Sequence, residues 1–188
     1  MIFSLFKRRD ANAELVGRLH EAVANAARAP AFYRDLHVPD TVEGRFDMMV
    51  LHAFLTLRRL KALPAPAEDL AQDLIDAVFK GFDHALRELG VGDVSVPKRM
   101  KTMAGAFFGR AKAYELALGG GEPLADAVLR NVYAHAPERR ADADRLAAYV
   151  REAVGRFEAA GFDDIAAARL PFPDPDAFCA AASVTPTA

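Results

Sequence analysis

The residues with the most chemical potential in this chain are five histidines and one cysteine, and they form no catalytic or metal-binding pattern. The histidines lie in different segments, without the His-x-x-Glu-His or Glu-x-x-His spacing that puts metal ligands on one helical face. Cys179 has no second cysteine to pair with and no activating neighbour in sequence. Gly90-Val91-Gly92 has neither a preceding strand nor the following Gly-Lys-Ser/Thr of a phosphate-binding loop. The sequence therefore predicts a non-enzymatic binding protein with no cofactor and no metal.

Residues 96–118 carry the pattern most typical of a binding surface. On a helix, Gly105 and Gly109 lie one turn apart, on the side opposite an apolar stripe. Each interior glycine costs about 1 kcal/mol of helix stability relative to alanine, so the pair indicates a place where another backbone approaches closely. The cations flanking the pair are Lys98, Lys101 and Lys112 on one side and Arg99 and Arg110 on the other. This surface either packs within the protein's own bundle or meets carboxylates or lipid phosphates of a partner, and both readings stay open.

Composition and charge place these residues in one helical domain. The chain has 188 residues, of which 52% are hydrophobic, and a formal net charge of −2, whereas nucleic-acid-binding proteins are usually strongly basic. Apolar residues recur at helical spacing, and we find no alternation typical of strands. We therefore expect an all-α bundle of six to seven helices in residues 11–168. The second main helix is predicted to begin at a capping box of Asp40 and Glu43 and to end near residue 63. The other main helices are predicted at about 12–28, 67–89, 96–118, 123–134 and 141–160.

The predicted helix that ends near Leu63 is apolar on two opposite faces. Its main stripe consists of Phe46, Met49, Val50, Ala53, Phe54, Leu57 and Leu60. Met48, Leu51 and Leu55 lie on nearly the opposite side. Such a helix is either central in a bundle or exposes a sticky surface, and the central position is favoured.

The two ends of the chain differ in composition from the predicted bundle. Residues 1–10 combine apolar side chains with a basic run: Ile2, Phe3, Leu5, Phe6, Lys7, Arg8 and Arg9. The apolar residues precede the basic ones, which is the reverse of the order in a signal peptide. This segment is therefore either a packed or frayed terminus or a weak interfacial membrane anchor. Residues 169–188 are rich in proline and alanine, and we expect them to form a mobile tail.

Two long segments of the sequence resemble a known family. The string LRELGVGDVSVPKRMKTMAGAFFGRAKAY, from Leu86 to Tyr114, closely resembles the signature of the ubiquinol–cytochrome c chaperone family. VPDTVEGRFDMMVLHAFLTLRRL, from Val38 to Leu60, is similar to that family's other recognisable block. Together with the helix between them, these segments cover most of residues 38–118.

The resemblance implies an assembly factor for the cytochrome bc1 complex that binds the cytochrome b subunit or another subunit, rather than an enzyme. Mitochondrial members pair with a small helical partner, which this chain could also have. The family positions point to a binding surface at Arg87, Glu88, Gly90, Gly92, Asp93, Pro97, Lys98, Arg99, Met100, Lys101, Gly109, Arg110 and Tyr114. The chain lacks the long N-terminal extension of mitochondrial members, so it resembles a bacterial form.

Three functional alternatives follow. The leading one is a chaperone in which the second and fourth predicted helices capture a client segment, in the cytoplasm or at the cytoplasmic face of the inner membrane. The second is a peripheral lipid-binding protein that uses residues 1–9 and the basic flank of helix 96–118. The third is a role at the ribosome, which the slightly acidic net charge argues against.

Overall fold

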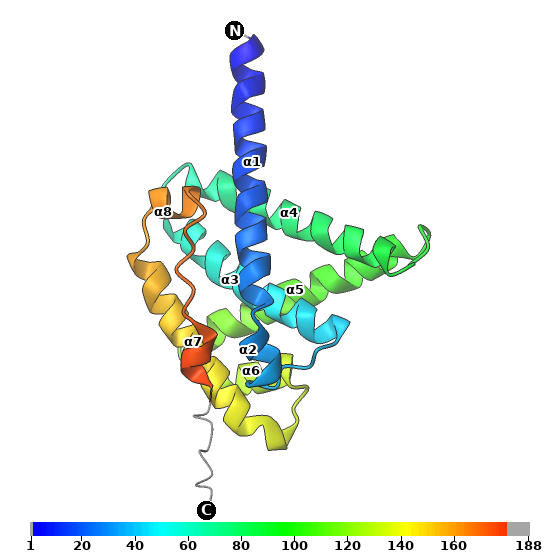
Figure 1. The fold of residues 1–188 in the computed structure, drawn as a ribbon, viewed down its shortest axis with the longest axis vertical. Coiled ribbons are helices and arrows are strands. Elements are labelled where there is room, and N and C mark those ends of the chain that lie inside the picture. The colour runs from blue at the N-terminus through cyan, green and yellow to red at the C-terminus, as the bar shows by residue number, and fades with distance from the viewer. Residues whose placement is uncertain (1, 180–188) are drawn as a thin grey trace, which may run out of the picture.

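The structure is a computed structural model, in which residues 2–179 are described, with side chains from residue 12 onward. Its helices are α1 (Ile2–Ala27), α2 (Pro30–Arg34), α3 (Val42–Ala62), α4 (Ala67–Glu88), α5 (Val96–Leu118), α6 (Leu124–Val132), α7 (Arg140–Ala159) and α8 (Phe162–Ala166). Two 3-10 turns, η1 (Pro137–Arg139) and η2 (Pro175–Phe178), complete the described part of the chain, which contains no strand (Figure 1). The all-α prediction is confirmed.

Helix α3 is the centre of the bundle. It packs against α1, α4, α5, α6 and α7. Both of its apolar faces are used, because the buried residues include Val50 and Leu57 on one side and Leu51 and Leu55 on the other. The prediction of a central helix is therefore confirmed, and the helix offers little apolar surface of its own to a partner.

A buried histidine joins α3 to α7. His52 Nδ1 lies 2.8 Å from the carbonyl oxygen of Met48 and can only donate to it. His52 Nε2 lies 2.9 Å from the Tyr149 hydroxyl and therefore accepts a hydrogen bond from it. Burial lowers the pKa of His52 to about 4, so the ring is neutral near pH 7. His52 is thus a satisfied core residue that fixes how α7 sits on α3.

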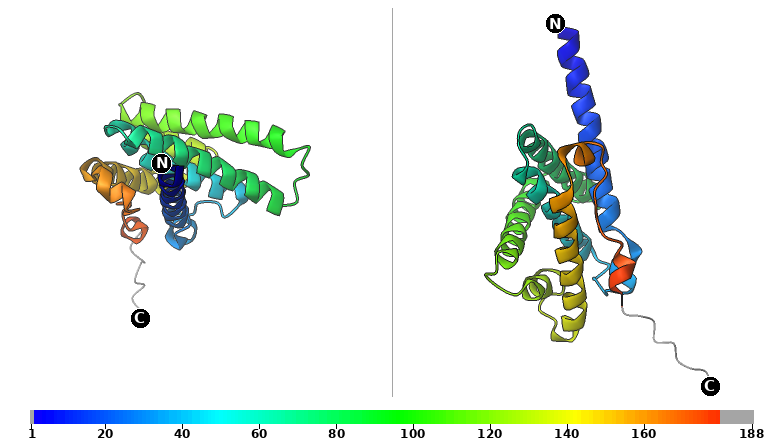
Figure 2. Two further views of the ribbon diagram at one scale, coloured as in Figure 1. Left: turned by 90° about the horizontal axis from the view of Figure 1, so that it is seen from above. Right: turned by 90° about the vertical axis from the view of Figure 1, so that its left-hand side faces the viewer.

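Helices α4 and α5 form an antiparallel hairpin whose connecting loop projects from the body (Figure 1). Seen from above, α5 lies along one edge of the molecule with α4 beside it (Figure 2, left). Only Val96, Phe107, Tyr114 and Ala117 of its 23 residues are buried. The fold therefore leaves most of α5 available to other molecules.

Both ends of the chain differ from the sequence-based expectation. Helix α1 is continuous from Ile2 and extends beyond the body, rather than starting near residue 12 after a separate segment (Figure 1). The side chains of residues 2–11, among them the predicted membrane contacts, lie outside the described residues. Leu170, Phe172 and Phe178 pack against the core, so residues 170–179 are not the loose tail that was predicted. Residues 180–188 lie outside the described residues.

The predicted cap of α3 is also corrected. The side chain of Thr41, not Asp40, accepts from the helix, through a 3.1 Å hydrogen bond from the Gly44 N–H. Asp40 instead pairs with Arg45 at 2.7 Å. A neighbouring hydroxyl can fill a capping position as well as a carboxylate, so sequence spacing alone does not choose between them.

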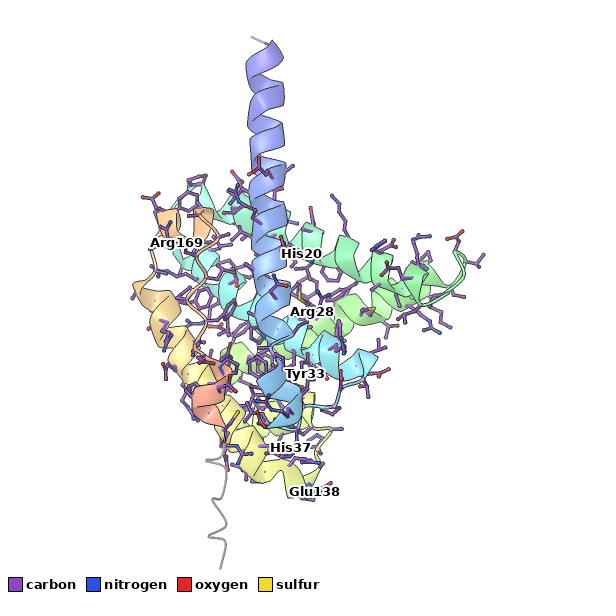
Figure 3. The ribbon with its side chains drawn as sticks, viewed as in Figure 1. His20, Arg28, Tyr33, His37, Glu138 and Arg169 are labelled. Carbon is purple, nitrogen blue, oxygen red and sulfur yellow. The ribbon has the colours of Figure 1, made fainter. Side chains whose placement is uncertain are left out.

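Side chains also fasten the α2 region to the bundle. The Tyr33 hydroxyl donates to the carbonyl oxygen of Ala27 at 2.8 Å. His37 Nδ1 lies 3.2 Å from a carboxylate oxygen of Asp142, at the start of α7. Figure 3 labels Tyr33 and His37 in this lower part of the molecule. Both contacts lie away from the α4–α5 hairpin, so they support the fold rather than the candidate surface.

Candidate binding surface on helix α5

An ion pair under α5 sets how the helix is rotated against α3. Arg110 Nε lies 2.7 Å from Asp47 Oδ1, and the Arg110 guanidinium sits 5.3 Å from the centre of the Phe46 ring. Asp47 is nearly inaccessible to solvent, and burial raises its pKa to about 6 although Arg110 opposes the shift. One turn further along α5, Tyr114 is fully buried and packs beside Phe54.

Two predicted partner-binding residues therefore point toward the core, Tyr114 fully buried and Arg110 partly buried. The prediction that Tyr114 lies on a binding surface is wrong, because none of its side chain is accessible. Arg110 does not flank Gly105 and Gly109 as predicted, because its guanidinium is turned inward to Asp47. A family position can be occupied for packing as well as for binding, and sequence spacing does not separate these two uses.

The opposite side of α5 is open. A Cβ atom added at Gly105 or Gly109 would have no neighbour within 4 Å, so these glycines do not pack inside the bundle. Of the two readings left by the sequence, the exposed surface is thus correct. Lys98, Lys101 and Lys112 are exposed on this face, and none has an ion-pair partner among the described side chains.

Two apolar side chains complete this surface and were missed by the sequence analysis. Phe108 is 53% exposed and Leu116 is 56% exposed. Both lie within one turn of the glycines or of Lys112, so helical spacing from Gly105 could have identified them. We define the open α5 face as the side that carries Lys98, Lys101, Gly105, Phe108, Gly109, Lys112 and Leu116.

A groove of about 590 Å³ lies next to the open α5 face, between α3, α5 and α7, with one residue of α4. Its apolar lining includes Phe54, Phe107 and Phe157, and Phe108 stands at its border. Arg58 crosses it, with contacts of 3.3 Å to Glu115 and 3.4 Å to Glu158. The groove extends the apolar part of the open α5 face toward α7.

The loop between α4 and α5 explains the Gly-x-Gly-Asp element of the sequence. Gly90 has a φ of +78°, a conformation that side-chain-bearing residues rarely adopt. Arg87 forms ion pairs with Asp83 and with Asp93, so it closes the loop across its base. Glu88 lies 3.2 Å from His84. Arg87, Gly90 and Asp93 thus shape the turn, whereas the Glu88 side chain contacts α4 itself, and Gly92 and Pro97 are exposed beside the turn.

One group of side chains has the composition of a metal site. Ligand atoms of Asp35, Asp176 and Cys179 lie within 4.8 Å of one another. Arg34 already pairs with both carboxylates, at 2.5 Å to Asp35 and 3.4 Å to Asp176. The guanidinium therefore occupies both carboxylates and offsets part of their negative charge, and this group gives no reason to assign a metal.

Comparison with known proteins identifies the family. Residues 34–172 match the family model described as ubiquinol-cytochrome C chaperone. The chain belongs to this family. The crystal structure of the Cbp3 homolog from Brucella abortus is similar to it, with 40% sequence identity over 94% of this chain and 98% of that chain, and a TM-score of 0.80. No protein of curated function matches the chain.

Membership of the ubiquinol-cytochrome C chaperone family covers the whole candidate surface, because α5 lies within the matched residues. Within the described part of the chain, no helix is both long and apolar enough to span a membrane.

Proposed function

We propose that this protein is an assembly chaperone of the cytochrome bc1 complex that binds its cytochrome b subunit through the open α5 face. The family assignment supports the assembly role. The observation that carries the choice of surface is the empty space over Gly105 and Gly109, in a helix that would be more stable with alanine at both positions.

The chemistry of the open α5 face suits a helical client segment. The absent side chains let a second helix approach closely, and Phe108 and Leu116 supply apolar contact beside the glycines. Lys98, Lys101 and Lys112 can pair with acidic groups at the end of such a segment and so fix its direction. No bond is made or broken, so capture is reversible and the client can later enter the complex.

We assign α3, the second main helix predicted from the sequence, a smaller part in client capture than the sequence suggested. Most of α3 is buried against five other helices, and it reaches the groove only with its second half, which includes Phe54, Arg58 and Lys61. We propose that a client bound on α5 extends into this groove. A small helical partner, if this chain has one, competes for the same surface or completes it.

Deletion of the gene tests the assembly role. We expect lower levels of the assembled bc1 complex and of cytochrome b, because a membrane subunit that is not captured is exposed to degradation before assembly. Haem and protein content of isolated membranes give both quantities. Restoration by the wild-type gene is the control, and normal levels of both in the deletion strain would contradict the proposal.

A further inference from the structure

We propose that the tip of the α4–α5 hairpin, residues 89–101, docks onto a bilayer surface that contains anionic lipids. This inference goes beyond the chaperone role and does not depend on which subunit is the client. It concerns the end of the hairpin, whereas the open α5 face lies along its side. Lys98 and Lys101 belong to both surfaces.

The hairpin tip presents apolar side chains that the fold does not use. Val94 is 95% exposed and Leu89 is 59% exposed, although both belong to residue types that are usually buried. They lie in the loop that projects from the body, and side chains spread outward around this end of the hairpin (Figure 3). Two apolar groups on a convex end can enter the headgroup region of a bilayer without rearrangement of the fold.

The charges beside these residues complement anionic lipids. Lys98, Arg99 and Lys101 occupy the first two turns of α5, directly after the loop, and are exposed. Among the described side chains none of the three has an ion-pair partner. Of the acids at this end of the hairpin, Asp93 pairs with Arg87, and Glu88 lies 3.2 Å from His84, which balances its charge only when protonated. The tip therefore combines apolar side chains at its end with free cations just behind them, at the depth where lipid phosphates would lie.

The loop holds this arrangement without a ligand. The Val91 N–H donates to the Leu86 carbonyl oxygen at 3.0 Å, and the Ser95 N–H donates to that of Gly92 at 2.8 Å. Arg87 clamps the same loop through Asp83 and Asp93. Docking therefore orders little additional backbone. Val94 and the three cations do not line the groove beside α5. They also do not line a second cavity, between α1, α3 and α4, which of the tip residues only Leu89 borders. A flat surface therefore suits Val94 and the cations better than an inserted peptide.

Vesicle flotation of the full chain tests the inference. The vesicles contain phosphatidylcholine alone or with about one third phosphatidylglycerol, at low and high salt. We expect binding to the anionic vesicles only, weakened by salt. Replacing Lys98, Arg99 and Lys101 together with glutamine should lower binding about 100-fold, because each cation near an anionic surface contributes roughly a factor of five. Leu89→Glu with Val94→Glu should lower it at least tenfold.

The matched control is Val42→Glu, which changes a comparably exposed apolar residue at the start of α3, outside both the tip and the open α5 face. It should bind vesicles as the wild type does, and melting curves confirm that all variants fold. The inference is overturned if the tip variants float like the wild type, if neutral vesicles bind equally well, or if deleting residues 1–9 alone abolishes flotation. It is also overturned if the tip variants lose a protein partner but keep vesicle binding, since the tip would then be a protein contact.

Discussion

Replacement of Arg110 by methionine is expected to lower the free energy of unfolding by about 1.5 kcal/mol at pH 7, because Asp47 can take up a proton once its partner is lost. Arg110 is the cation paired with Asp47, and removing one member of a buried pair leaves the other charge without compensation. The methionine keeps apolar contact with Phe46, so most of the loss comes from electrostatics. Chemical denaturation at equilibrium measures the difference.

The effect of Arg110→Met should depend on pH in a defined direction. The pKa of Asp47 is about 6 in the folded protein, above its ordinary value of 3.8, and loss of Arg110 raises it further. The folded state then binds a proton that the unfolded state has released. The variant's deficit relative to the wild type should therefore grow as the pH rises above about 6 and shrink as the pH falls below about 5, where Asp47 is protonated in both folded proteins.

Two further variants isolate the buried pair. Arg99→Met removes an exposed arginine from the same helix and should change stability by less than about 0.5 kcal/mol. Asp47→Asn combined with Arg110→Met removes both charges and should recover most of the loss at pH 7. If Arg110→Met kept wild-type stability yet lost client binding, Arg110 would be a contact residue and its structural assignment would be wrong.

Gly109→Leu is expected to weaken client binding by about 10- to 100-fold while the protein remains fully folded. The new side chain projects into the space where a client helix would lie, at a cost typical of overpacking a close contact. Within the isolated protein it meets no atom within 4 Å at its Cβ, and leucine favours the helix more than glycine does. The melting temperature should therefore stay equal or rise slightly. Pull-down from detergent-solubilised membranes measures the binding.

Gly155→Leu is the matched control for this prediction. Gly155 is also an exposed helical glycine with no atom within 4 Å of an added Cβ, but it lies on α7. The same gain in helix propensity should appear there without loss of the client. Equal binding by Gly109→Leu and the wild type would remove the open α5 face from the account.

Local patterns predict much of this fold because they depend on neighbours in sequence. The bounds of α5 follow from Pro97 in its first turn and the glycines after Leu118, and the central place of α3 follows from its two apolar faces. The packing of Phe172 and Phe178 against the core depends on distant residues, and the prolines around them are equally typical of a loose tail. The sequence therefore predicts the helices better than it predicts the course of the C-terminal segment.

The candidate site was predictable only in part for a similar reason. The spacing of Gly105 and Gly109 indicates a close-approach surface, but whether that surface is internal depends on the rotation of α5. The rotation depends on the ion pair between Arg110 and Asp47. Asp47 is only 5% exposed to solvent, and no sequence pattern indicates that it is buried. The family signature includes both inward positions, such as Tyr114, and exposed positions, such as Lys101, and does not distinguish them.

Site-specific photocrosslinking in growing cells tests whether cytochrome b lies against the open α5 face. A photoreactive phenylalanine analogue replaces Phe108 on the open α5 face, and in a matched strain it replaces Val42, which is also 53% exposed but lies at the start of α3. After irradiation, the crosslinked proteins are identified by mass spectrometry. We expect an adduct with cytochrome b from position 108 and none from position 42. Absence of cytochrome b from the adducts at 108, or equal recovery from both positions, would contradict this expectation.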